Sequence, residues 1–239
     1  MPRLPRLRRF RDLDAAALNV DYQVHTTRTD GAASIAELLA AARARGLAAL
    51  AFTEHVRRDT PWFAEFAAAV RQAAQACPDL QIHVGCEAKV LDADGTLDAS
   101  EAVLAECTLV LGSVHRFPDG QGGYLDFANL GAAACAELEY ELALGLLRRA
   151  PIHVLAHPGG MTQRRHGCFP RERLRKILDA SLDRGIAIEI NTSYLRDVRG
   201  FLDLCADVNP YVSIGSDVHH LDELGRCRDT LLGLLGFKP

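Results

Sequence analysis

The sequence lacks the features that mark several protein classes. Its 239 residues contain no run of 18 apolar residues, and the arginine-rich start, MPRLPRLRRFRDL, has no continuous apolar stretch of the kind found in signal peptides. Its seven cysteines are scattered and form no C-x-x-C pair, a pattern that favours reduced thiols over a disulfide framework or a zinc finger. We therefore expect a soluble, cytoplasmic protein that has no membrane partner.

An excess of positive charge is also missing, because the formal net charge is −4. Any affinity for anions must therefore be local, and we expect a small partner rather than nucleic acid. With 49% hydrophobic residues and no low-complexity segment, the chain can bury one sizeable core. We predict a single domain over residues 1–239, in which residues 1–18 form an arginine-rich extension that is solvated and partly disordered.

Short apolar, β-branched runs alternate with amphipathic helical patterns. The segment SIAELLAAARARG is typical of the helices: Ser34 is the N-cap, Glu37 follows three residues later, and Gly46 ends the helix. A spacing of about 30 residues between strand ends is that of a strand and its returning helix. This predicts an α/β protein with a mostly parallel sheet, either a seven-stranded barrel or an open doubly wound sheet. The strand-like runs end near Val24, Thr53, Cys86, Val114, Ala156, Ile190 and Ser216.

Histidines recur just after the predicted strands. In parallel α/β folds the carboxyl ends of the strands converge on one face, so these side chains are expected to meet there. A lone histidine at a strand end is more often structural, but five at equivalent ends reverse that expectation. The five are His25, His55, His115, His157 and His219. We assign His83, His153 and His166 to structure and leave His220 undecided.

Carboxylates share these positions. Asp30 lies in the turn after the first strand, Glu87 follows IHVGC, and Asp217 lies in SIGSDVHH. Ligation by histidine and carboxylate without thiolate suits zinc, manganese or iron, and clustered carboxylates can bridge two ions. The pattern predicts a multinuclear metal site.

Arginines near three of these motifs bear on the substrate. Arg28 lies in the first turn, Arg116 follows His115, and Arg196 lies in NTSYLRDV. Guanidinium groups beside a metal site favour an oxyanion such as phosphate, which they bind through forked hydrogen bonds. One such arginine is more often a solvated surface residue, so the prediction depends on the three together.

Taken in order, the motifs resemble the polymerase and histidinol phosphatase (PHP) domain family. They are DYQVHTTRTDG, LAFTEH, VGCEAKVLDADGTLD, LGSVH, LAHPG, EINTSYLR and IGSDVHH, and they span nearly the whole chain. The resemblance implies a distorted seven-stranded (β/α)7 TIM-like barrel that holds two or three divalent ions of zinc, manganese or iron. It places metal ligands at Gln23, His25, Asp30, His55, Glu87, His115, His157, Asp217 and His219.

The resemblance also divides these ligands among ions. One ion would take Gln23, His25, Glu87 and Asp217; a second Glu87, His115 and His157; a third Asp30, His55 and His219. Gln23 departs from the family, which usually has histidine there. Its amide oxygen is a neutral ligand that binds zinc less well than imidazole, so the first ion is expected to be weaker, harder in type or absent.

The activity implied by the resemblance is metal-dependent hydrolysis of a phosphate ester. The lack of a basic face favours a small phosphomonoester, as in the histidinol phosphatases. A hydroxide that bridges two ions would attack phosphorus. The residues expected to take part in catalysis are Glu87, Asp217, Arg28, Arg116 and Arg196.

Three alternatives remain open at this point. The first is a phosphodiesterase or nuclease of the same family. The second is an amidohydrolase-type metal hydrolase, which normally has an intact H-x-H on its first strand and often a carboxylated lysine. The third is a degenerate, non-catalytic domain that binds a metal or metabolite, although such a domain would be expected to lose more than one ligand.

Overall fold

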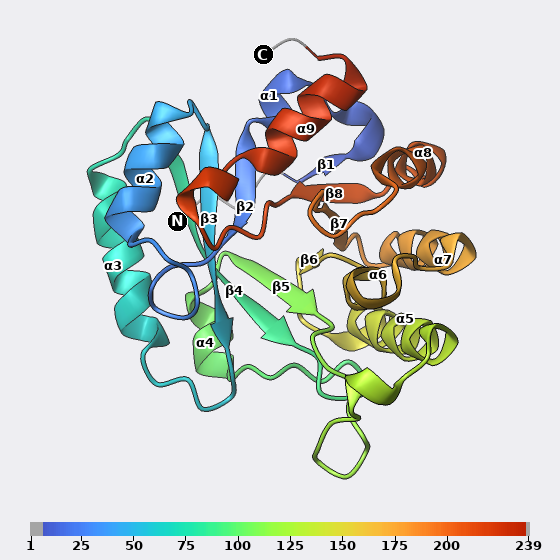
Figure 1. The fold of residues 1–239 in the computed structure, drawn as a ribbon. Helices are drawn as coiled ribbons and strands as arrows, with labels where there is room; N and C mark the ends of the chain where they lie inside the picture. The colour runs from blue at the N-terminus through green and yellow to red at the C-terminus, as the bar shows by residue number, and fades with distance from the viewer. Residues whose placement is uncertain (1–6, 238–239) are drawn as a thin grey trace.

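The computed structural model describes residues 7–237 and contains one sheet surrounded by helices (Figure 1). The strands are hydrogen-bonded in the order β1-β8-β7-β6-β5-β4-β3-β2. Strands β2 to β8 are parallel, and β1 runs antiparallel to β8. The strands are β1 (Arg8–Arg9), β2 (Val20–Val24), β3 (Ala49–Val56), β4 (Gln81–Lys89), β5 (Leu109–Ser113), β6 (Val154–Leu155), β7 (Ala187–Ile190) and β8 (Tyr211–Ile214).

Helices follow the parallel strands, and α5, α7 and α8 pack side by side along the β6–β8 side (Figure 1). The predicted capping box of Ser34 and Glu37 is confirmed at the start of α2, and Gly46 follows its end with a φ of 66°. In the range 7–237, no helix has the length and apolarity needed to cross a membrane. The helices are α1 (Ala15–Leu18), α2 (Ile35–Ala44), α3 (Phe63–Gln75), α4 (Glu101–Glu106), α5 (Ala132–Arg149), α6 (Gly160–His166), α7 (Arg171–Ser181), α8 (Val198–Val208) and α9 (Arg226–Leu235), with short 3₁₀ turns at Phe10–Asp12, Phe127–Asn129 and Leu221–Glu223.

The sheet curls until its two ends meet without forming a full ladder. Between β2 and the segment after β8 there is one isolated parallel bridge, Val24 to Val218. Here the backbone N–H of His25 donates to the Val218 carbonyl at 2.9 Å, and that of Val218 donates to the Gln23 carbonyl at 3.0 Å. The α/β prediction of seven parallel strands in a distorted, barrel-like sheet is confirmed, while closure is only partial.

Two strands extend further than the sequence pattern predicts. Strands β3 and β4 continue three residues past the expected ends at Thr53 and Cys86, because polar residues remain in the ladder. His55 and Glu87 are consequently neighbours in register within the sheet rather than residues of the following turns. The site therefore begins inside the sheet.

The prediction of a partly disordered N-terminal extension is wrong for residues 7–18, although side chains such as Arg8 and Arg11 are exposed. Strand β1 pairs with β8, the Phe10 side chain is buried, and Arg11 Nε donates to the Ala206 carbonyl at 2.8 Å, near the end of α8. This strand was not predicted, because two consecutive arginines do not match an apolar strand pattern. Residues 1–6 lie outside the described range.

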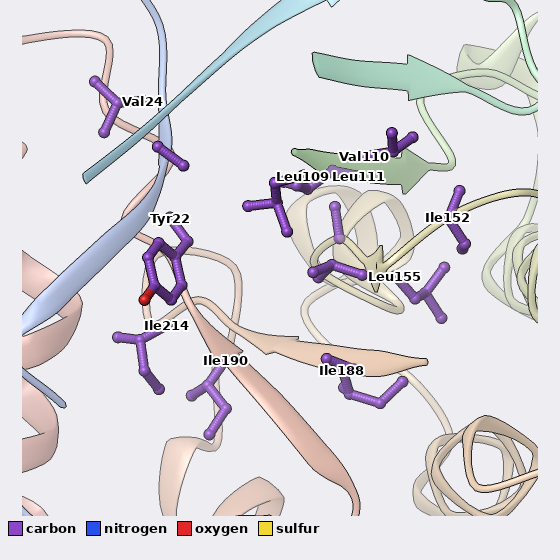
Figure 2. Close-up of a cluster of buried hydrophobic side chains, with 14 of the residues drawn as sticks. Tyr22, Val24, Leu109, Val110, Leu111, Ile152, Leu155, Ile188, Ile190 and Ile214 are labelled. Carbon is purple, nitrogen blue, oxygen red and sulfur yellow. The ribbon is translucent and has the colours of Figure 1, made fainter. Parts of the chain in front are cut away.

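Apolar side chains from opposite parts of the sheet meet in one core. Figure 2 shows Tyr22 of β2 with Leu111 of β5, Leu155 of β6, Ile188 of β7 and Ile214 of β8, and all five are buried. Burying one such side chain contributes roughly 1.5–3 kcal/mol. This packing fixes the strands whose carboxyl ends carry the polar cluster described next.

Candidate metal centre

A cavity of about 740 Å³ opens where the carboxyl ends of the parallel strands converge. His25 is buried, with 1% of its surface exposed, and contacts residues that line this cavity. The structure thus brings together all five histidines expected to meet. The lining comprises Asp30, His55, Glu87, His115, His157, Met161, Arg164, Ser193, Tyr194, Asp217, His219, His220, Glu223 and Arg226.

Glu87 lies at the centre of the cluster and is almost completely buried. Its Oε1 is 3.0 Å from Nε2 of His115 and 3.0 Å from Nε2 of His157. Its Oε2 is 3.1 Å from Nδ1 of His55 and 3.6 Å from Nε2 of His25. One carboxylate therefore approaches four imidazoles, a geometry suited to a ligand shared between ions.

Two further carboxylates complete the cluster. Asp217 Oδ1 is 3.1 Å from His25 Nε2. The two oxygens of Asp30 lie 3.3 Å from His55 Nε2 and 3.4 Å from His219 Nε2.

Within residues 7–237, three groups have ligand atoms close enough together to hold an ion. The group of His25, Glu87 and Asp217 matches the set predicted for the first ion, except that it lacks Gln23. The group with Glu87 and His115 contains His55 where His157 was predicted. The group with Asp30, His55 and His219 contains His25 in addition to the predicted set. The three groups are His25, Asp30, His55 and His219; His55, Glu87 and His115; and His25, Glu87 and Asp217.

The buried atoms of the cluster fit divalent cations. Both ring nitrogens of His25 and Oε2 of Glu87 are buried and, despite their short approaches, form no hydrogen bond within the described part of the chain. Leaving such atoms unpaired is costly, whereas imidazole nitrogen and carboxylate oxygen are good ligands for zinc, manganese and iron. The donor set therefore suits two or three ions.

The carboxylates of the cluster favour the protonated form of two of its imidazoles. Burial opposes protonation of His55 and His157, but the close contact and the charge of Glu87 outweigh burial and raise the pKa of each to about 9. Burial likewise opposes ionisation of Glu87, but the charges and hydrogen bonds of the surrounding histidines hold its pKa well below 4.5. Metal binding must therefore displace protons from imidazoles.

Glu189 on β7 bonds to the backbone of one cluster histidine, and it was not predicted from the sequence. It is 1% exposed, and its Oε2 accepts a hydrogen bond from the backbone N–H of His157 at 2.8 Å. His157 has a φ of 28°, a backbone conformation that non-glycine residues rarely adopt. Burial raises the pKa of Glu189 to about 8. The available signal was a carboxylate within the apolar run GIAIEI, because such residues are rarely buried without a partner.

Glu54 on β3 holds the first turn, which carries Asp30. Its Oε1 accepts from the backbone N–H of Thr26 at 2.8 Å, and its other oxygen accepts from the Thr29 hydroxyl. Gly31 is required at the end of this turn because a Cβ there would lie 2.4 Å from the His25 carbonyl oxygen. Asp30 is thus placed by a buried carboxylate and a tight turn.

Gln23 lies beside the cluster, and its amide oxygen accepts a hydrogen bond from outside it. Its Oε1 accepts from Asn191 Nδ2 at 3.3 Å, while its Nε2 is buried with no hydrogen-bond partner within residues 7–237. Gly215 packs against it, since a Cβ there would lie 2.9 Å from Gln23 Cβ. Its role as a ligand stays a prediction.

The three arginines expected to bind phosphate do not line the cavity. Arg28 lies 3.7 Å from Glu65 and over the Trp62 ring. Arg116 lies over the Tyr124 ring, and Arg196 is exposed and borders a separate, smaller cavity between α7 and α8.

Arg164 and Arg226 line the metal cavity instead. Arg226 Nη2 donates to Ser193 Oγ at 2.6 Å. These arginines belong to α6 and α9, and no strand-end motif pointed to them.

The remaining histidines divide as the sequence suggested. His153 Nδ1 accepts from the Val110 backbone at 3.0 Å, His83 packs edge-on against Tyr22, and His166 contacts Cys135. None of these three lines the cavity, whereas His220 does. His220 also starts the 3₁₀ turn Leu221–Glu223, in which its backbone N–H donates to Glu223.

Comparison with known proteins gives consistent matches. The PHP domain model matches residues 21–193. A protein of Caldicellulosiruptor bescii named "Probable phosphatase" is 27% identical over 158 residues, and the match spans 63% of this chain and 58% of that protein. "Probable phosphatase YcdX" of Escherichia coli O127:H6 is 23% identical over 233 residues, 92% of this chain and 87% of that protein.

A solved structure supports the fold. It is that of a Listeria monocytogenes protein provisionally named histidinol phosphatase hisK, which superposes with a TM-score of 0.70. The superposition covers 88% of this chain and 99% of the Listeria chain at 17% sequence identity. At this identity the likeness concerns the fold.

Proposed function

Because the chain belongs to the PHP domain family, we propose that it is a metal-dependent phosphatase that hydrolyses a small phosphomonoester. The observation that carries this proposal is the single buried carboxylate of Glu87, which approaches four imidazoles at the base of a cavity. The phosphatase names of its relatives support the same reaction class. The formal net charge of −4 favours a small substrate over a nucleic acid.

The metal ligands we propose are His25, Asp30, His55, Glu87, His115, His157, Asp217 and His219, with Gln23 as a further candidate. When bound, two or three divalent ions would activate a water molecule near neutral pH and neutralise charge on the phosphoryl group. Burial opposes ionisation of Asp217, but its close contact with the His25 imidazole, 3.1 Å away, outweighs burial and lowers its pKa. Asp217 is therefore ionised near neutral pH, which suits a ligand better than a proton donor.

The substrate phosphate would bind beside the two arginines that line the cavity. Arg164 and Arg226 both line the cavity, so we propose that they contact the phosphoryl oxygens. The role proposed from the sequence for Arg28, Arg116 and Arg196 stays a prediction, and it requires these side chains to leave their present partners.

A chelation experiment tests the proposal. Protein stripped of metal should lose hydrolysis of p-nitrophenyl phosphate and regain it when manganese or zinc is added. Activity that survives complete stripping would contradict the proposed chemistry.

A parallel assay with bis(p-nitrophenyl) phosphate separates a monoesterase from a diesterase. Faster hydrolysis of the diester would favour the phosphodiesterase alternative. Binding of fewer than two ions per chain, with neither ester hydrolysed, would favour a non-catalytic domain.

A further inference from the structure

Tyr194 stands out among the cavity residues because it contacts both a carboxylate and an imidazole of the cluster. It lies in the turn between β7 and α8, outside any strand, and is half-buried. It is neither a histidine nor a carboxylate, so its residue type does not mark it as a metal ligand.

The Tyr194 hydroxyl fixes the orientation of Asp217. It donates a hydrogen bond to Asp217 Oδ2 at 2.8 Å, while Oδ1 of the same carboxylate lies 3.1 Å from His25 Nε2. One carboxylate oxygen of Asp217 is thus hydrogen-bonded to the phenol, and the other faces the His25 imidazole. Asp217 has a φ of 52°, a backbone conformation that residues other than glycine adopt uncommonly.

The Tyr194 ring packs against two other cavity residues. It stacks on the His157 imidazole with a centroid distance of 4.4 Å and an interplanar angle of 16°. The Arg164 guanidinium carbon lies 4.9 Å from the ring centroid, and its Nη1 donates to the Tyr194 hydroxyl at 3.2 Å. The ring therefore restrains His157 and also keeps Arg164 at the cavity wall.

Gly160, at the start of α6, leaves the space that this ring occupies. A Cβ at Gly160 would lie 2.6 Å from Tyr194 Cδ1, closer than real contacts allow. The small residue on α6 and the large ring after β7 are therefore matched in size.

We infer that Tyr194 is a positioning residue that holds Asp217 and His157 in ion-binding geometry and keeps Arg164 facing the substrate. This inference rests on the proposed function, because it assumes that Asp217 and His157 ligate ions. Hydrogen-bonded partners behind a ligand typically change metal affinity by about 10–100-fold when removed. The hydroxyl and the ring make different contacts: the hydroxyl bonds to Asp217 and Arg164, whereas the ring stacks on His157 and lies under Arg164.

The first test removes the hydroxyl alone. In Tyr194→Phe, the affinity for manganese and zinc, measured by calorimetric titration of chelator-treated protein, should fall by about 10–100-fold. Tyr211→Phe is the matched control, because Tyr211 lies on β8 and stacks with Arg9 instead. An unchanged ion affinity in Tyr194→Phe would overturn the inference even if wild type binds ions and hydrolyses phosphate.

The second test moves the ring without removing any polar group. Gly160→Ala should weaken ion binding in wild type and have much less effect in a Tyr194→Leu background, because the clash is then relieved. Equal effects in both backgrounds would show that Gly160 acts independently of Tyr194, contrary to the inference. Arg164→Gln should raise KM for p-nitrophenyl phosphate while leaving ion affinity unchanged. A wild-type protein that binds no ions would instead remove the proposed function itself.

Discussion

The two halves of the ligand cluster are held by different kinds of structure. His55 and Glu87 lie opposite each other in the β3–β4 ladder, where eight consecutive residue pairs are in register. His157 and Asp217 follow the short strands β6 and β8, and both have positive φ values. Backbone pairing fixes His55 and Glu87, which we call the ladder half. Side-chain contacts from Glu189 and Tyr194 fix His157 and Asp217, which we call the loop half.

This difference indicates where supporting residues matter. A ladder residue keeps its position when a neighbouring side chain changes, because its backbone hydrogen bonds remain. A residue in a strained loop keeps its position only while its side-chain partners hold it. Substituting a residue that contacts the loop half should therefore weaken ion binding. In the ladder half, only substitution of a ligand itself should weaken it.

The largest effect should come from Glu87 in the ladder half. Glu87→Gln removes the charge shared by four imidazoles, so we expect hydrolysis of p-nitrophenyl phosphate to fall on the order of 10³-fold. Ion binding measured by calorimetry should lose at least one site per chain. Glu101→Gln on the surface of α4 is the control, and a Glu87 variant as active as this control would contradict the shared-ligand role.

Glu189 provides the next test, in the loop half. Glu189→Leu leaves the His157 N–H buried without an acceptor and should weaken ion binding by about 10–100-fold. Because burial raises the pKa of Glu189 to about 8, the carboxyl is mainly protonated at pH 7, and Gln should replace it with only a few-fold loss. If Glu189→Leu and Glu189→Gln bind ions equally well, the hydrogen bond to His157 does not hold the loop half.

The pH dependence of stability reports on both halves. In chelated protein, the pKa of His55 and of His157 is raised from 6.5 to about 9, so the stability they contribute is complete below about pH 6.5 and is lost as the pH rises through 9. The lowered pKa of Glu87 adds stability that is present above its ordinary value of 4.5. Urea unfolding of chelated protein should therefore show greatest stability between these limits and a loss of several kcal/mol by pH 9, because one pKa unit corresponds to about 1.4 kcal/mol.

Excess manganese or zinc should reverse this trend, because ions bind the neutral imidazoles and their affinity rises with pH. A chelated protein whose free energy of unfolding stays constant from pH 6.5 to 9 would contradict the proton-bearing cluster. His153→Gln is a suitable control, since His153 lies outside the cavity.

The sequence identified the residues of both halves but not the side chains that hold the loop half. The histidines and carboxylates of both halves follow apolar runs whose period is set by local backbone geometry, so their convergence could be anticipated. Tyr194 and Glu189 act through contacts between segments distant in sequence, which no local pattern encodes. Arg164 and Arg226 reach the cavity from α6 and α9, whose packing against the sheet also lies beyond motif spacing.

Substitution of Gln23 should give the smallest effect. Gln23 lies on β2, beside the single bridge that joins β2 to the segment after β8. Its amide oxygen accepts from Asn191, so as it stands it contributes little to either half. Gln23→His would replace the amide with an imidazole beside His25 and Asp217, which should tighten zinc binding by up to about tenfold and favour zinc over manganese. Asn191→Ala frees the Gln23 amide and should favour manganese instead, because an amide oxygen is a harder ligand. If neither variant changes the calorimetric affinity for zinc or manganese, Gln23 is not a ligand and the first ion depends on His25, Glu87 and Asp217 alone.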